Sequence, residues 1–180
     1  MNRFQRTVDI LINLIKQTCG DTPKLGCEVG VWEGETSRVL LESFPSLELL
    51  MVDRFCPYYS KTNISLQKIN DVMLRCINNT SSFANRRVIL VGDSASVVSQ
   101  LIQQESLDFV YIDGNHSYSG IDRDLRVCWS KVKRGGLFCG HDYSEKHGKI
   151  GVKQAVDFFA ETRNSKVVYA GELIWMIPKK

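Results

Sequence analysis

Short apolar runs alternate with stretches of helical period along this chain, and the alternation restricts the folds that it can adopt. Helical patterns separate the first five runs, so we expect five parallel strands with helices covering both faces of the sheet. Only a tight Ala-Gly-Glu turn separates the last two runs, which indicates an antiparallel hairpin at one edge. The predicted strands are residues 25–29, 47–52, 87–91, 107–113, 136–142, 166–170 and 172–178.

The length of the chain indicates a single domain. At 180 residues, we expect one folding unit over residues 1–180, with a core of useful size. The N-terminal run VDILINLI is interrupted by polar residues and is interpreted as an amphipathic helix, not as a signal peptide. Residues 55–86 are long and polar around a helical stretch, LQKINDVMLRCINN. This segment is either a lid over a site or a plain surface excursion.

The clearest helical pattern covers residues 120–132. Ile121, Leu125, Cys128 and Val132 share one face of the predicted helix. The overlapping basic run KVKRGG is interpreted as the solvated end of that helix. The net charge is only +3, from 23 basic and 20 acidic residues, so the sequence disfavours a nucleic-acid partner.

The cysteines and the apolar runs bear on the compartment. The six cysteines include no pair with the C-x-x-C spacing of a zinc or redox site. Free thiols of this kind suit a reducing, cytoplasmic location. No apolar stretch is long enough to cross a bilayer, so no membrane association is expected.

A glycine turn in the stretch CEVGVWEGETS follows the first strand. Gly30 and Gly34 lack a Cβ and let the backbone approach a ligand closely. The turn lacks the Gly-Lys-Ser/Thr of a phosphate-binding loop, and Trp32 occupies a position where a dinucleotide-binding loop needs glycine. Glu28 and Glu33 would also repel phosphates. The turn is therefore either a tight strand–helix connection or a site for a ligand that is not strongly anionic.

Acids also end the second and third strands. Asp53 lies about 20 residues past the glycine turn, where a carboxylate can accept both hydroxyls of a ribose. Asp93 and Ser94 follow the third strand, where they could meet an adenine amino group and a ring nitrogen. Each could instead be an ordinary helix cap. Taken together, the three strand ends describe a nucleoside without phosphates that carries a cationic head, which is S-adenosylmethionine.

From Gly26 to about Ala160 the chain resembles the class I S-adenosylmethionine-dependent methyltransferases. The segments that carry the resemblance are EVGVWEGETS, VGDSA, DFVYIDGNHSYSGIDRDL and GGLFCGHDY with GVKQAV. The branch most similar to it contains the macrocin-type sugar O-methyltransferases and the cephalosporin-hydroxylase-like proteins. The resemblance implies an α/β, Rossmann-like methyltransferase fold, with a seven-stranded mostly parallel sheet and a C-terminal antiparallel hairpin. The implied cofactor contacts are Glu28, Gly30 and Gly34 on the methionine and ribose side, Asp53 on the ribose diol, and Asp93 and Ser94 at adenine.

The ends of the fourth and fifth strands are the predicted place for chemistry. A sulfonium is already a strong electrophile, so the protein must align the acceptor and remove its proton. Asp113 and Asp142 are the two carboxylates at these strand ends, and His116 follows Asp113 by three residues. A sugar hydroxyl has a very high pKa, which a divalent metal such as Mg²⁺ or Mn²⁺ would lower.

The resemblance assigns these residues roles, with one departure. In the similar sugar O-methyltransferases an aspartate, a histidine three residues later and an acid pair on the next strand bind the metal and act as base. The first member of that pair is His141 in this chain. His141, Asp113 and Asp142 are therefore the candidate metal ligands, and His116, Asp113 and His141 the candidate catalytic residues. The site could bind a metal weakly, prefer Mn²⁺, or work by base catalysis alone.

Three functions remain open at this stage. The leading hypothesis is an O-methyltransferase acting on a sugar or glycan. The second keeps the fold and changes the acceptor to a catechol, a phenol or another small hydroxyl compound. The third, from another class, is a non-catalytic S-adenosylmethionine-binding module. Little chain remains to build an acceptor pocket, so a homodimer could contribute part of it.

Overall fold

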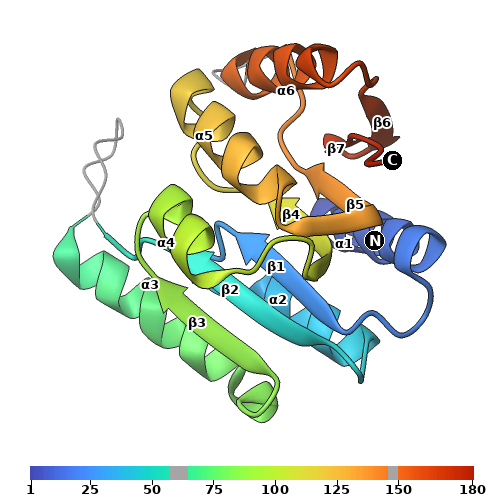
Figure 1. Ribbon diagram of the computed structural model, residues 1–180. Coiled ribbons are helices and arrows are strands. Elements are labelled where there is room, and N and C mark those ends of the chain that lie inside the picture. The colour runs from blue at the N-terminus through green and yellow to red at the C-terminus, as the bar shows by residue number, and fades with distance from the viewer. Residues whose placement is uncertain (57–64, 146–149) are drawn as a thin grey trace.

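The computed structural model describes residues 1–56, 65–145 and 150–180, with the backbone alone for Ile150. In these residues the strands form one seven-stranded sheet in the order β3-β2-β1-β4-β5-β7-β6 (Figure 1). The strands are β1 (Leu25–Val29), β2 (Glu48–Asp53), β3 (Arg87–Val91), β4 (Leu107–Ile112), β5 (Val132–Gly140), β6 (Val168–Gly171) and β7 (Ile174–Met176). The helices are α1 (Arg3–Cys19), α2 (Glu35–Ser43), α3 (Leu66–Asn79), α4 (Ser94–Leu101), α5 (Tyr118–Trp129) and α6 (Ile150–Thr162), with a 3₁₀ turn at Ser81–Phe83.

The topology confirms the predicted fold class. Strands β1 to β5 pair in parallel, and β7 pairs antiparallel with both β5 and β6 at one end of the sheet. The order of the strands reverses between β1 and β4, which become neighbours. Ligands bind at such a reversal in open parallel sheets, beyond the carboxyl ends of the strands.

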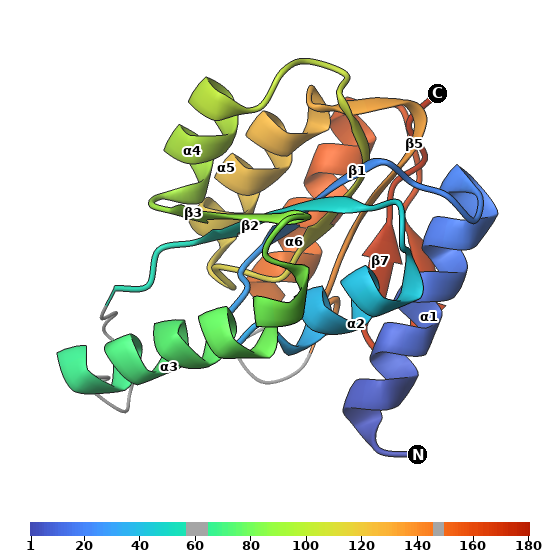
Figure 2. The same ribbon diagram turned by 90° about the horizontal axis from the view of Figure 1, so that it is seen from below.

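Helices cover both faces of the sheet, as predicted (Figure 2). One apolar cluster joins the sheet to α4, α5 and α6, and includes Val98, Leu125 and Phe159. A second cluster joins the opposite face to α1 and α2, and includes Leu11, Leu40 and Phe44. Strands buried on both faces explain why the sequence shows continuous apolar runs instead of alternation.

The N-terminal helix and the helix of the long polar segment are both where the sequence placed them. Helix α1 begins after Asn2, whose side chain caps it, and buries Val8, Leu11 and Ile15. Helix α3 begins after Ser65, whose side chain accepts a hydrogen bond from the backbone of Lys68. The rest of the proposed lid includes residues 57–64, which lie outside the described residues. Within the described chain, no helix combines the length and apolar character needed to span a membrane.

The predicted end of the helix at 120–132 was wrong. Helix α5 buries Ile121, Leu125 and Cys128, but it ends at Trp129, and Val132 begins β5. The KVKRGG run therefore lies mostly in a strand. Its first lysine, Lys131, is buried and donates to the carbonyls of Ser99 and Ile102 (3.2 and 2.7 Å) near the end of α4. These acceptors hold Lys131 in place at the point where the chain leaves the helix.

Candidate functional site

A cleft of about 830 Å³ lies beyond the carboxyl ends of the parallel strands. Most of the residues predicted to bind the cofactor or carry out the chemistry line this cleft. These are Gly30, Asp53, Asp93, Ser94, Asp113 and His116. The cleft thus lies at the reversal of strand order, where the topology favours a ligand site.

Gly30 is required by a close approach of two backbones. Its φ of +89° lies in the left-handed region, and a Cβ added to it would lie 2.3 Å from the carbonyl oxygen of Asp113. On either side, the amide of Asp113 donates to Val29 (2.7 Å) and the amide of Gly30 donates to Val52 (2.9 Å). Only glycine fits between these strand ends.

Asp53 organises the glycine turn. One carboxylate oxygen, Oδ2, accepts hydrogen bonds from the backbone amides of Val31 (2.9 Å) and Trp32 (3.0 Å). The other, Oδ1, accepts one from the amide of Phe55 (2.9 Å). A carboxylate offers about four acceptor positions, so one remains open at Oδ1. Asp53 therefore keeps acceptor capacity for a ligand, and its predicted contact with both hydroxyls of a ribose stays a prediction.

Asp93 and Ser94 lie at the start of α4, and each has a partner already. Asp93 caps the helix by accepting from the amide of Ser96 (3.3 Å), and its other oxygen is 3.7 Å from Arg123. The hydroxyl of Ser94 donates to Asp124 (2.5 Å). The predicted adenine contacts therefore belong to a connected group of side chains in the cleft wall.

Sequence reasoning missed Asp124. This residue lines the cleft with only 2% of its surface exposed. Burial raises the pKa of its carboxyl to about 6, against the lowering effect of the Ser94 hydrogen bond. The signal was present in the sequence, because Asp124 interrupts the apolar face that Ile121 and Leu125 form on the predicted helix.

Glu28 and Gly34 lie beneath the turn, and neither is part of the cleft wall. Glu28 is buried and accepts a hydrogen bond from the hydroxyl of Ser37 in α2. Gly34 begins α2 with a φ of +76°, and a Cβ there would lie 3.2 Å from the sulfur of Cys76 in α3. Glu28 thus points toward α2, and Gly34 packs against α3. A direct contact between either residue and the cofactor stays a prediction.

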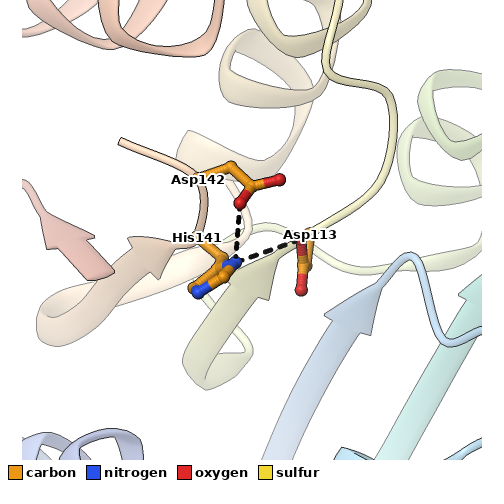
Figure 3. A group of neighbouring side chains, drawn as sticks. All are labelled: Asp113, His141 and Asp142. Atoms are coloured by element: carbon orange, nitrogen blue, oxygen red, sulfur yellow. Dashed lines mark ion pairs between the residues drawn. The ribbon is translucent and has the colours of Figure 1, made fainter. Parts of the chain in front are cut away.

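Three of the predicted residues converge at the end of β4 and β5 (Figure 3). Asp113, His141 and Asp142 each offer a ligand atom, and these atoms lie within 4.8 Å of one another. Nδ1 of His141 is 3.1 Å from Oδ1 of Asp142 and 3.7 Å from Oδ1 of Asp113. Asp142 is buried and has a φ of +63°, a left-handed conformation that few non-glycine residues adopt.

The ring orientation of His141 follows from its second nitrogen. Nε2 lies 2.9 Å from the carbonyl oxygen of Glu172, so this nitrogen carries the hydrogen. Nδ1 then faces the two carboxylates. Burial lowers the pKa of His141, but hydrogen bonds to Asp113 and Asp142 outweigh it and raise the pKa to about 9. A proton at Nδ1 thus occupies the place where a divalent ion would bind.

His116 joins the same cluster from the cleft side. Its Nε2 is 3.1 Å from Oδ2 of Asp142 and 3.6 Å from Oδ1 of Asp113. The side chain is 44% exposed, so the ring can meet a substrate that enters the cleft. The structure therefore brings together Asp113, His116, His141 and Asp142, all four residues predicted for chemistry.

Comparison with known proteins identifies the class. A family model described as a methyltransferase domain matches residues 27–143, more than half of the chain, and the chain belongs to that family. It is an S-adenosylmethionine-dependent methyltransferase, in agreement with the resemblance stated from the sequence. A comparison with curated proteins gave no significant match.

Solved structures share the fold at low sequence identity. The O-methyltransferase NovP is 17% identical with a TM-score of 0.70, over 95% of this chain and 80% of that one. The calicheamicin methyltransferase CalS11 is 15% identical with a TM-score of 0.68, over 98% of this chain and 80% of that one. The SAH-bound methyltransferase PaMTH1 of Podospora anserina is 12% identical with a TM-score of 0.67, over 100% of this chain and 80% of that one. At such identities these structures support the fold alone.

We expect Asp53→Ala to weaken the binding of S-adenosylhomocysteine by about 1–3 kcal/mol, because a buried hydroxyl loses a charged acceptor and the turn loses its hydrogen bonds. Isothermal calorimetry would measure this loss, and NAD should not bind either protein. Asp21→Ala, at a side chain 86% exposed and far from the turn, is the matched control. Unchanged affinity in Asp53→Ala would remove Asp53 from the cofactor site.

We expect Glu28 to make the folded protein less stable as pH rises. Burial raises the pKa of Glu28 from 4.5 to about 8. The folded chain therefore keeps a proton that the unfolded chain loses, and the free energy of unfolding falls between these two values by at most about 1.4 kcal/mol per pH unit. Glu28→Gln keeps an acceptor for Ser37 and has no proton to lose. Urea denaturation across this pH range should show a shallower decline for Glu28→Gln, whereas the exposed control Glu42→Gln should match the wild type. Parallel curves for Glu28→Gln and wild type would contradict this account.

Proposed function

We propose that this protein transfers a methyl group from S-adenosylmethionine to a hydroxyl of a sugar or glycan, with a divalent metal at Asp113, His141 and Asp142. One observation carries the proposal. Two carboxylates and two imidazoles meet beyond the ends of β4 and β5, and two of these four side chains, Asp113 and His116, line the same cleft as the predicted nucleoside-binding residues Asp53 and Asp93. A module that only binds S-adenosylmethionine has no use for this second cluster.

The residues at the cluster fit a divalent ion. Asp113 and Asp142 provide oxygen ligands, and His141 provides Nδ1 while its Nε2 hydrogen is held by a carbonyl. Ligating histidines almost always have such a partner on the second nitrogen. Carboxylates with one imidazole suit Mg²⁺ or, because of the nitrogen, Mn²⁺. A bound ion would lower the pKa of an acceptor hydroxyl and orient its oxygen.

His116 is the proposed general base. The acceptor oxygen attacks the methyl carbon of the sulfonium and the carbon–sulfur bond breaks. With Asp113 and Asp142 engaged by the ion, Nε2 of His116 would no longer need to donate to them and could take the hydroxyl proton. This nitrogen is the ring atom closest to Asp142 and Asp113, so it faces an acceptor held beside them. The side chain is exposed enough to pass the proton on to water afterwards.

The acceptor class is drawn from the resemblance and from one structural relative. The CalS11 structure is described as a TDP-rhamnose 3′-O-methyltransferase, a sugar-modifying enzyme. A catechol or phenolic acceptor is the second candidate, because two adjacent hydroxyls can share one metal ion in either kind of molecule. We further propose that the enzyme is cytoplasmic and forms a homodimer whose second subunit contributes to the acceptor pocket. Its acceptor is a small molecule or a glycan, and it binds neither nucleic acid nor membrane.

We expect methyl transfer to depend on a divalent metal and to select sugars. Radiolabelled S-adenosylmethionine would be offered with nucleotide sugars, oligosaccharides and catechols, with and without EDTA. EDTA should abolish transfer, Mg²⁺ or Mn²⁺ should restore it, and Asp142→Asn should require a higher metal concentration because a ligand loses its charge. Methyl transfer to catechols alone would contradict the proposed sugar acceptor and favour the second candidate. Full activity in EDTA would contradict a role for the metal, and general base catalysis would be the remaining mechanism.

We expect His116→Ala to lower turnover by about 100-fold or more, the usual contribution of a positioned base. The affinity for S-adenosylhomocysteine should hardly change, because the ring lies on the acceptor side of the cleft. Steady-state kinetics and calorimetry would measure the two quantities. Near-normal turnover would place the base elsewhere, with His141 as the next candidate. Lost cofactor binding or unfolding would show instead that His116 is structural.

A further inference from the structure

The turn between β6 and β7 has an unusual backbone. Gly171, Glu172 and Leu173 all have positive φ, at +106°, +43° and +67°. Two-residue hairpin turns demand positive φ at their central positions, and Asn-Gly is the preferred pair there. A side chain in this region costs roughly 1–2 kcal/mol per residue. The chain places Glu and Leu at the two central positions, so contacts outside the turn must hold its shape.

Those contacts come from two segments that are far apart in the sequence, α1 and the residues after β5. Oε1 of Glu172 accepts a hydrogen bond from Nε of Arg6 (2.7 Å) in α1, and Oε2 lies 3.6 Å from Nε of Arg3. The carbonyl of Leu173 accepts from the backbone amide of Tyr143 (3.0 Å), the residue after Asp142. The turn is thus tied to the N-terminal helix on one side and to the metal-ligand segment on the other.

The turn also holds His141 itself. The carbonyl of Glu172 accepts from Nε2 of the His141 ring (2.9 Å), and the indole nitrogen of Trp175 in β7 donates to the backbone carbonyl of His141 (3.0 Å). The ring is therefore held from behind, on the side away from Asp113 and Asp142. This hydrogen bond fixes which nitrogen of His141 is available to an ion.

We propose that the Glu172–Leu173 turn, tied to α1 by Arg6 and Arg3, is a positioning element that directs Nδ1 of His141 toward the metal. The inference rests on the metal site of the proposed function. It explains why the turn carries a glutamate where turn chemistry alone favours asparagine. The glutamate provides the carboxylate that fastens the carbonyl behind His141 to the N-terminal helix.

Two substitutions separate this role from simple support of the fold. Glu172→Asn keeps a residue that tolerates positive φ and removes the carboxylate, so the turn itself should not lose stability. Arg6→Gln removes the arginine that donates to Oε1 of Glu172 and leaves the turn sequence and Arg3 intact. The matched control is Arg38→Gln, which breaks an ion pair of the same length, 2.7 Å to Glu42, on the surface of α2.

Electron paramagnetic resonance of free Mn²⁺ would give the metal dissociation constant of the purified protein at fixed pH, without turnover. We expect Glu172→Asn and Arg6→Gln each to weaken Mn²⁺ binding by about tenfold, the lower end for loss of an outer-shell partner. The double variant should bind Mn²⁺ no more weakly than Glu172→Asn alone, because Arg6 acts on the turn through the Glu172 carboxylate. Melting temperature, S-adenosylhomocysteine affinity and the Arg38→Gln control should stay at wild-type values.

The outcomes distinguish the two proposals. If the wild-type protein does not bind Mn²⁺, and Asp142→Asn gives the same result, the metal site is overturned. The role of the turn is then overturned with it. Weaker binding in Asp142→Asn with wild-type binding in both turn variants would overturn the turn's role and leave the metal site standing. Losses of Mn²⁺ affinity that follow equal losses of melting temperature would show that the turn only supports the fold.

Discussion

The backbone contact between Gly30 and Asp113 is the constraint on which the site depends. These residues follow β1 and β4, which are neighbours only because the strand order reverses between them. The missing Cβ of Gly30 lets the carbonyl of Asp113 come to a distance that any other residue would forbid. The turn that Asp53 organises and the loop that carries Asp113 and His116 therefore share one fixed junction. A displacement at this junction would move the residues proposed for cofactor binding and those proposed for catalysis relative to each other.

Much of this arrangement could be predicted, because it follows from rules that act along the chain. Apolar runs and helical periods predicted the sheet and its hairpin, which the structure confirms. Parallel strands end at one edge, so Asp53, Asp93 and Asp113 had to lie near one another once the strands were placed. The alternation of side chains along a strand explains the position of Glu28. Successive side chains of a strand alternate between faces, and Cys27 and Val29 pack toward α4–α6, so Glu28 points to the other side.

The rest depended on contacts between segments far apart in the sequence. Asp124 meets Ser94 only because α5 packs beside α4. The partner of His141 is the backbone carbonyl of Glu172. Every residue has a backbone carbonyl, so no pattern of side chains predicts which one is used. The turn that presents it breaks the usual preference for Asn-Gly, so sequence rules for hairpins give no hint of its geometry. Local propensity predicts elements well, whereas these partners are selected by packing and charge.

Burial and hydrogen bonding determine which carboxyl groups of the site are charged at neutral pH. Burial of Glu28, with further repulsion from Asp113 and Asp53, raises its pKa to about 8, so it is largely neutral at pH 7. Burial works in the same direction on Asp113, but hydrogen bonds to His116 and His141 keep its pKa below the usual value. Asp113 thus keeps its negative charge at the cleft, whereas Glu28 beneath the turn carries little charge. Such a field favours a sulfonium over a phosphorylated cofactor. Methyl transfer removes that positive charge, so the same carboxylates attract the donor more strongly than the spent product.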